Sequence, residues 1–122
     1  MDVLIVDDDE AVRKTFQRAL ERAGFMVHAV DNGLAAFAEL QQQQYRAIVC
    51  DVSMPFLQGN NVYDELQAAN PDMARRMIFV TGWAGREDIK EFLAKSGRPF
   101  LAKPVDLKTL VETVRRVAEG PA

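Results

Sequence analysis

The sequence predicts a single α/β domain, in which helices cover both faces of a parallel five-stranded sheet. Short apolar runs rich in β-formers alternate five times with stretches whose apolar residues recur at helical spacing. The first such run, Val3 to Val6, is continuously apolar, as expected of a parallel strand buried on both faces. The length of 122 residues fits one domain with a single core. We place this domain over residues 1–119 and expect a frayed tail over 120–122.

The first half of the chain predicts three strands and two helices. The expected strands are 3–6, 26–30 and 47–50, and the expected helices are 10–23 and 34–43. Gly24 ends the first helix, and Asp31-Asn32-Gly33 marks the turn before the second. His28 interrupts the second strand, which makes that strand the weakest of the three.

The second half predicts two more strands and three more helices. The expected strands are 77–80 and 99–102, and the expected helices are 62–69, 86–95 and a last one that starts at 107. Asn70-Pro71 closes the first of these helices, and a leading Pro99 suits an edge strand. Asp106 is the expected cap of the last helix. That helix has the clearest amphipathic stripe of the chain, formed by Leu107, Leu110, Val111, Val114 and Val117.

Strands and helices that alternate in this way form right-handed βαβ units. We expect the strand order 2-1-3-4-5, in which the direction of winding reverses between the first and third strands. Ligands of open α/β sheets bind outside the carboxyl ends of the strands at that reversal. Asp7 and Asp8 follow the first strand and Asp51 follows the third, so all three carboxylates are expected there.

Three carboxylates in one crevice repel one another by several kcal/mol unless a cation is present. Oxygen ligands on a rim open to water suit Mg²⁺, which keeps some of its waters and takes one or two protein carboxylates. The alternative is that these residues only cap the helix that follows. We assign that capping role to Asp9 and the metal site to Asp7, Asp8 and Asp51.

Composition excludes several other classes of function. The net charge of −3 argues against a nucleic-acid-binding surface, and no apolar stretch approaches the roughly 20 residues of a membrane span. The start has no basic region or cleavage site of a secretory signal, and a lone Cys50, expected to be an inert buried thiol, fits a reducing cytoplasm. His28 is the only histidine, which excludes a histidine metal cluster, and a Ser-His-Asp relay could come only through His28. No Gly-rich phosphate loop is present.

Four short motifs together resemble the CheY-like receiver domain of two-component response regulators. They are Val6-Asp7-Asp8, Asp51 with Pro55 four residues on, Thr81-Gly82, and Lys103-Pro104. The match spans essentially the whole chain, in order and at suitable spacings. The resemblance implies a flavodoxin-like (βα)5 three-layer sandwich and a cytoplasmic phospho-acceptor switch that is not a turnover enzyme.

The resemblance also implies how the acidic residues divide their roles. Asp51 accepts a phosphoryl group from a phosphohistidine of a histidine kinase or a histidine phosphotransfer protein. Asp8, Asp51 and the backbone carbonyl of Ser53 ligate Mg²⁺, with Mn²⁺ as a substitute, and Asp7 acts through water. Phosphoryl transfer needs an in-line nucleophile and neutralised charge, which agrees with these roles.

Further residues are implied to sense the phosphoryl group. Thr81 donates its hydroxyl to a phosphoryl oxygen, Lys103 contacts the group with its ammonium, and Pro104 fixes a turn, with the family having a cis bond before it. Phe100 occupies the position of the family's rotating aromatic, or is an inward core residue. Trp83 is bulky where many receivers carry smaller groups. It either shields the aspartyl phosphate from water or packs on the loop or a partner surface.

By the resemblance, phosphorylation reshapes the face formed by helix 86–95, strand 99–102 and the last helix, which an undetermined downstream partner contacts. The chain is expected to be a monomer or a weak phosphorylation-dependent dimer. The stretch 96–100 is similar to receivers of hybrid sensor kinases, so a stand-alone regulator and a module of a longer protein both remain open.

Two alternatives belong to other classes. A haloacid-dehalogenase-like hydrolase needs a second Asp two residues after its nucleophile, where this chain has Ser53. A scaffold receiver that works without phosphorylation would not need the complete set of motifs.

Overall fold

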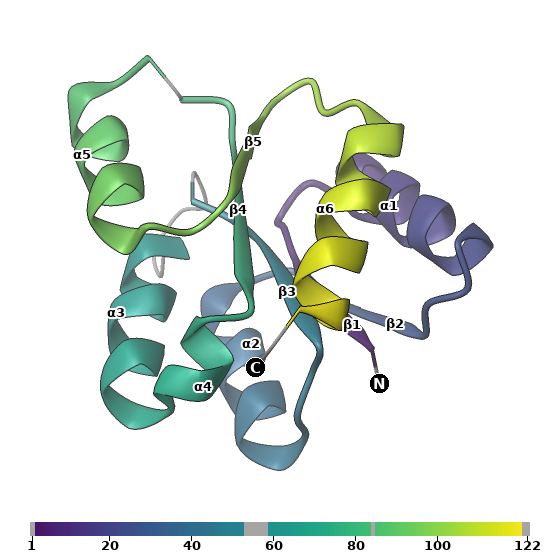
Figure 1. The fold of residues 1–122 in the computed structure, drawn as a ribbon, viewed down its shortest axis with the longest axis horizontal. Helices are drawn as coiled ribbons and strands as arrows, with labels where there is room; N and C mark the ends of the chain where they lie inside the picture. The colour runs from purple at the N-terminus through teal and green to yellow at the C-terminus, as the bar shows by residue number, and fades with distance from the viewer. Residues whose placement is uncertain (1, 53–58, 84, 121–122) are drawn as a thin grey trace.

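The computed structural model describes residues 2–52, 59–83 and 85–120 (Figure 1). Its sheet contains five parallel strands in the order β2-β1-β3-β4-β5, which confirms the predicted topology. The strands are β1 (Val3–Val6), β2 (Val27–Val30), β3 (Ala47–Asp51), β4 (Met77–Thr81) and β5 (Phe100–Ala102). Strands β1 and β3 are neighbours, in a register that pairs Val6 with Cys50.

Helices cover both faces of this sheet. They are α1 (Glu10–Arg22), α2 (Gly33–Gln42), α3 (Gly59–Ala69), α4 (Pro71–Ala74), α5 (Glu87–Ser96) and α6 (Leu107–Glu119). Helices α1 and α6 lie on one face, and α2 to α5 lie on the other (Figure 1). Each face has its own apolar core, so the molecule is a three-layer sandwich.

Strand β1 supplies both cores at once. Val3 and Ile5 pack with α1 and α6, whereas Leu4 and Val6 pack with the helices of the other face. All four side chains are fully buried because successive residues of a strand point to opposite faces. This explains why the run is continuously apolar.

The helix capping predictions meet different outcomes. The Asp9 carboxylate accepts the main-chain N–H groups of Ala11 and Val12 at 2.9 and 3.2 Å, which confirms that it caps α1. Asp106 lies at the N-cap of α6, but its carboxylate accepts the Thr109 hydroxyl instead of a main-chain N–H. Leu107 was predicted to point into the core and is 38% exposed, because the buried stripe of α6 begins one turn later.

The short helix α4 contradicts the prediction that Asn70-Pro71 only closes the preceding helix. The Asn70 side chain accepts the N–H of Met73 at 3.3 Å, and Pro71 occupies the first turn, where its missing N–H costs nothing. The same two residues therefore end α3 and start α4. Strand β5 begins one residue later than predicted, at Phe100. Within the described residues, no helix is both long enough and apolar enough to span a membrane.

Candidate functional site

Three aspartates meet at the carboxyl ends of β1 and β3. Asp7 follows β1, Asp51 ends β3, and Asp8 is the next residue after Asp7. Their carboxylate oxygens lie within 4.8 Å of one another. Asp7 and Asp51 are only 1% and 3% exposed, whereas Asp8 faces solvent. The structure thus brings together the acid cluster that the sequence predicted.

Lys103 reaches this cluster from the end of β5. The Lys103 N–H donates to the carbonyl of Thr81 at 2.8 Å, which extends the β4–β5 pairing by one residue. Its ammonium lies 2.9 Å from Oδ2 of Asp51 and 3.3 Å from Oδ2 of Asp7. The Lys103–Pro104 peptide bond is cis, which settles the isomer that the sequence left open.

Burial and mutual charge set the electrostatics of the cluster. Burial raises the pKa of the Asp7 carboxyl, and the nearby Asp51 charge adds to this. A hydrogen bond from the Asp9 N–H and the Lys103 ammonium lower the pKa of Asp7 only in part. Burial lowers the pKa of Lys103, but its contacts with Asp51 and Asp7 outweigh burial and raise it overall. Lys103 therefore stays charged, and the buried carboxylates favour a further cation.

Arg13 is a part of the site that the sequence prediction missed. Its guanidinium donates to the main-chain carbonyl of Asp7 at 2.9 Å and so fixes the backbone at the end of β1. Arg13 lies six residues along the chain, on α1, and no motif marks it. Its role depends on how the helix packs against the sheet.

Thr81 lies at the same end of the sheet. The register pairs Asp51 with Val80, so Thr81 lies one residue beyond the last β3–β4 pair. Its side chain is fully buried, and its Oγ1 accepts the N–H of Trp83 at 2.8 Å. Trp83 is 37% exposed, with the guanidinium of Arg86 4.6 Å from the centroid of its ring.

Phe100 and Ser53 complete the residues predicted from the sequence. Phe100 is 48% exposed on the edge strand β5, so its interpretation as an inward core residue does not hold in this conformation. Ser53, the predicted carbonyl ligand, lies outside the described residues, as does Pro55.

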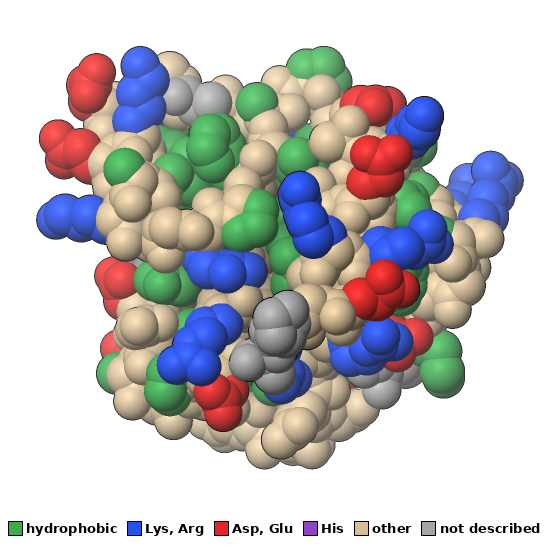
Figure 2. Space-filling model, viewed as in Figure 1, with side chains coloured by type: hydrophobic (Ala, Val, Ile, Leu, Met, Phe, Trp, Pro, Cys, Tyr) green, Lys and Arg blue, Asp and Glu red, His purple; other side chains and the backbone are tan. Residues whose placement is uncertain are grey.

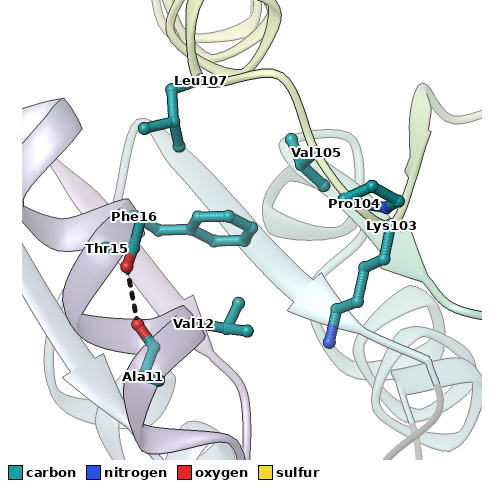
Figure 3. Close-up of a pocket in the computed structure, with 8 residues that line it drawn as sticks. All are labelled: Ala11, Val12, Thr15, Phe16, Lys103, Pro104, Val105 and Leu107. Carbon is teal, nitrogen blue, oxygen red and sulfur yellow. Dashed lines mark hydrogen bonds between the residues drawn. The ribbon is translucent and has the colours of Figure 1, made fainter.

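An apolar hollow of about 580 Å³ lies between α1 and the segment that follows β5 (Figure 3). Val12 and Phe16 of α1 face Pro104 and Val105 across it, and the stem of Lys103 runs along its edge. The Thr15 hydroxyl at this hollow donates to the Ala11 carbonyl of its own helix at 2.8 Å. The charged site is thus flanked by apolar surface on the side of α1.

The thiol of Cys50 is buried and stays protonated. Its side chain is fully buried, and burial raises the pKa of its thiol well above the usual value. A thiol that stays protonated is a poor nucleophile, in agreement with the inert role predicted for it.

The chain matches the family model "Response regulator receiver domain" over residues 3–115. It is 34% identical over 119 residues to the sensor kinase CckA of Brucella abortus, covering 96% of this chain but only 12% of CckA. It is 29% identical to the response regulator receiver protein CpdR of the same organism, covering 94% of each chain.

Solved structures agree with this match. The signal receiver domain of a histidine kinase from Syntrophus aciditrophicus superposes with a TM-score of 0.87 at 26% identity, covering 98% of this chain and 90% of that one. The chemotaxis protein CheY4 of Vibrio cholerae gives 0.82 at 26% identity, covering 95% and 97%. With the sheet order and the site geometry, these matches show that the chain belongs to the response regulator receiver domain family of two-component signalling proteins.

Proposed function

We propose that this chain is a Mg²⁺-dependent phospho-acceptor switch in which Asp51 takes a phosphoryl group from a phosphohistidine. The observation that carries the proposal is the position of the Asp51 carboxylate. It is nearly buried, lies in a cluster with two other carboxylates and contacts one ammonium at 2.9 Å. Membership in the receiver family favours this signalling role over the hydrolase alternative.

In the transfer step, a carboxylate oxygen of Asp51 forms a bond to phosphorus while the P–N bond of the phosphohistidine breaks. The electron pair of that bond returns to the imidazole of the donor. The protein positions the nucleophile and neutralises charge on the phosphoryl oxygens. Lys103 supplies one positive charge at the acceptor, and Thr81 supplies a hydroxyl that donates to a phosphoryl oxygen.

The acid cluster fits a divalent metal. Asp7, Asp8 and Asp51 offer hard oxygen ligands within 4.8 Å of one another, and burial, with the nearby Asp51 charge, raises the pKa of Asp7. We propose that Asp8 and Asp51 bind Mg²⁺ or Mn²⁺ directly, that Asp7 acts through water, and that the Ser53 carbonyl is a third ligand. When bound, the metal neutralises charge on the acceptor and the phosphoryl group.

The response to phosphorylation is proposed to pass from Thr81 to Phe100. Thr81 moves toward the phosphoryl group, and Phe100, exposed on β5, turns into the space that Thr81 leaves. The face formed by α5, β5 and α6 then changes shape. Two packings of one element, biased by a local charge, are sufficient for such a switch.

The proposed phosphate donor is a histidine kinase or a histidine phosphotransfer protein in the cytoplasm, and the downstream partner is a protein that contacts the α5–β5–α6 face. Two contexts have support. The match to CpdR over 94% of its length favours a stand-alone regulator, and the match to CckA favours a receiver within a hybrid kinase. Size-exclusion chromatography with and without phosphorylation tests the expected monomer or weak dimer.

Acetyl phosphate with Mg²⁺, followed by intact-mass measurement, tests the central step. The wild type gains the mass of one phosphoryl group, and Asp51→Asn gains none. Asp9→Asn is the matched control, because Asp9 only caps α1 and asparagine caps equally well. An unmodified wild type would refute the proposal and favour the scaffold alternative. An adduct of equal yield in Asp51→Asn would refute Asp51 as the acceptor.

A further inference from the structure

Trp83, Arg86 and Asp88 link the buried Thr81 to helix α5 through consecutive contacts. Thr81 Oγ1 accepts the Trp83 N–H at 2.8 Å, and the Trp83 carbonyl accepts the Arg86 N–H at 3.0 Å. The Arg86 guanidinium also lies 4.6 Å from the centroid of the Trp83 ring. We name these residues, with Asp88, the Thr81 tether.

At the far end of the tether, Arg86 pairs with Asp88, and both side chains are exposed. Arg86 donates to both carboxylate oxygens of Asp88, from Nε at 3.1 Å and from Nη2 at 2.7 Å. The same carboxylate accepts the Ile89 N–H at 2.9 Å in the first turn of α5. A bidentate guanidinium–carboxylate pair fixes orientation as well as distance. Arg86 is thus oriented by α5 while it stacks on Trp83.

We infer that Arg86 is a positioning residue that, through Trp83, holds the Thr81 hydroxyl in its observed place and so opposes its movement toward a phosphorylated Asp51. This inference rests on the proposed function, in which Thr81 moves. When Thr81 moves, it must either give up its bond to the Trp83 N–H or take Trp83 with it. The first change costs that hydrogen bond, and the second strains the contact of the Trp83 ring with Arg86.

The tether depends on arginine at position 86. Lysine in place of Arg86 would keep the charge but lose the planar fork and much of the stacking. Figure 2 shows acidic and basic side chains mixed over α5. The charge of Arg86 alone therefore does not distinguish it from its neighbours, whereas its contacts with Trp83 and Asp88 do. The inference rests on two contacts of the Arg86 guanidinium, one with the Trp83 ring and one with both carboxylate oxygens of Asp88.

Binding of beryllofluoride with Mg²⁺, a mimic of the aspartyl phosphate, tests this inference by calorimetry. Arg86→Ala should bind about two- to fivefold tighter than the wild type, because an exposed cation–π contact no longer holds the observed conformation. Asp88→Asn should shift the affinity in the same direction by less, and Arg86→Lys should fall between Arg86→Ala and the wild type. Lys90→Ala, an exposed lysine of the same helix, is the matched control and should leave the affinity unchanged.

The affinity for beryllofluoride is the readout that a purely structural role of Arg86 would not change, and fluorescence tests separately whether its guanidinium covers the Trp83 ring. Trp83 is the only tryptophan of the chain, so acrylamide quenching reports on its ring alone. Arg86→Ala should raise the quenching constant while the melting temperature stays close to that of the wild type and of Lys90→Ala.

The outcomes separate the tether from the proposed function. If the wild type binds beryllofluoride and gains phosphate, but Arg86→Ala and Asp88→Asn bind no more tightly than it does, the tether is refuted and the proposed function stands. If the wild type neither binds the mimic nor gains phosphate, both are refuted.

Discussion

Replacing Lys103 with methionine should destabilise the protein strongly when Mg²⁺ is absent. The Lys103 ammonium contacts two carboxylates that are almost completely buried, Asp51 at 2.9 Å and Asp7 at 3.3 Å. Methionine keeps most of the stem and removes only the charge. Asp7 and Asp51 then remain buried and close together without the Lys103 ammonium.

The magnitude follows from these distances. At an effective dielectric constant of about 20, the two contacts amount to roughly 6 and 5 kcal/mol of Coulomb attraction. The cost of burying the ammonium cancels much of this, and removing one partner of a buried ion pair typically costs about 3–5 kcal/mol. Because the Lys103 side chain is 24% exposed, we expect the lower end, about 3 kcal/mol. An unfolding entropy of about 2.1 cal/mol/K per residue converts this, for 122 residues, into a loss of roughly 12 °C in melting temperature.

Thermal unfolding in EDTA and in saturating MgCl₂ is the appropriate assay. In EDTA, Lys103→Met should melt far below the wild type, whereas Lys108→Met, an exposed lysine of α6, should not. In MgCl₂ the difference in melting temperature between Lys103→Met and the wild type should fall by roughly half, because a bound divalent cation supplies the positive charge that the lysine supplied. A gap of the same size in both buffers, or a Lys103→Met variant that melts with the control, contradicts this account of the site.

Three further predictions concern neighbouring parts of the site. Asp7→Asn should stabilise the Mg²⁺-free protein and reduce the stabilisation by Mg²⁺. Because folding raises the pKa of Asp7, its charge lowers the stability progressively as the pH rises from the carboxyl's pKa in the unfolded chain to its raised pKa in the folded protein. The stabilisation by Asp7→Asn should therefore be absent at acid pH, grow over this range and stay constant above it, and urea unfolding at several pH values checks the sign. Phe100→Ala should make binding of the downstream partner independent of phosphorylation, and equally phosphorylation-dependent binding would show that Phe100 does not couple the two. Trp83→Ala should shorten the lifetime of the phosphate on Asp51 about threefold or more if the ring shields it from water; an unchanged rate of phosphate loss, followed by intact mass, would remove the shielding role.

The sheet and the acid cluster were predictable because they depend on local signals. A continuous apolar run such as 3–6 requires helices on both faces of the sheet. A charged residue directly after such a run therefore lies beyond the carboxyl end of the strand, where the sheet meets solvent. Parallel pairing of β1 with β3 then brings Asp7 and Asp51 to the same end of the sheet, whatever their rotamers are. The position of Lys103 followed for the same reason, since it comes directly after β5.

Features that depend on packing between distant side chains were missed. Arg13 binds the Asp7 carbonyl only because α1 lies against the end of β1, and the sequence does not reveal that angle. The stack of Arg86 on Trp83 depends on rotamers in a loop. The helix α4 was missed for another reason, because Asn70-Pro71 signals both the end of one helix and the start of the next, and the sequence alone favoured the end.

On the proposed function, the contacts of Thr81 and Lys103 explain why the threonine, and not the lysine, transmits the signal. The Lys103 ammonium already contacts Asp51, so it can exchange a carboxylate oxygen for a phosphoryl oxygen with little displacement. The Thr81 hydroxyl instead accepts a hydrogen bond from Trp83, which belongs to the loop that leads into α5. A shift of Thr81 therefore either breaks this hydrogen bond or moves that loop, while a change of partner at Lys103 stays local. On the proposed function, Lys103 neutralises charge, and Thr81, which is bonded to the loop before α5, converts the new charge into a change of shape.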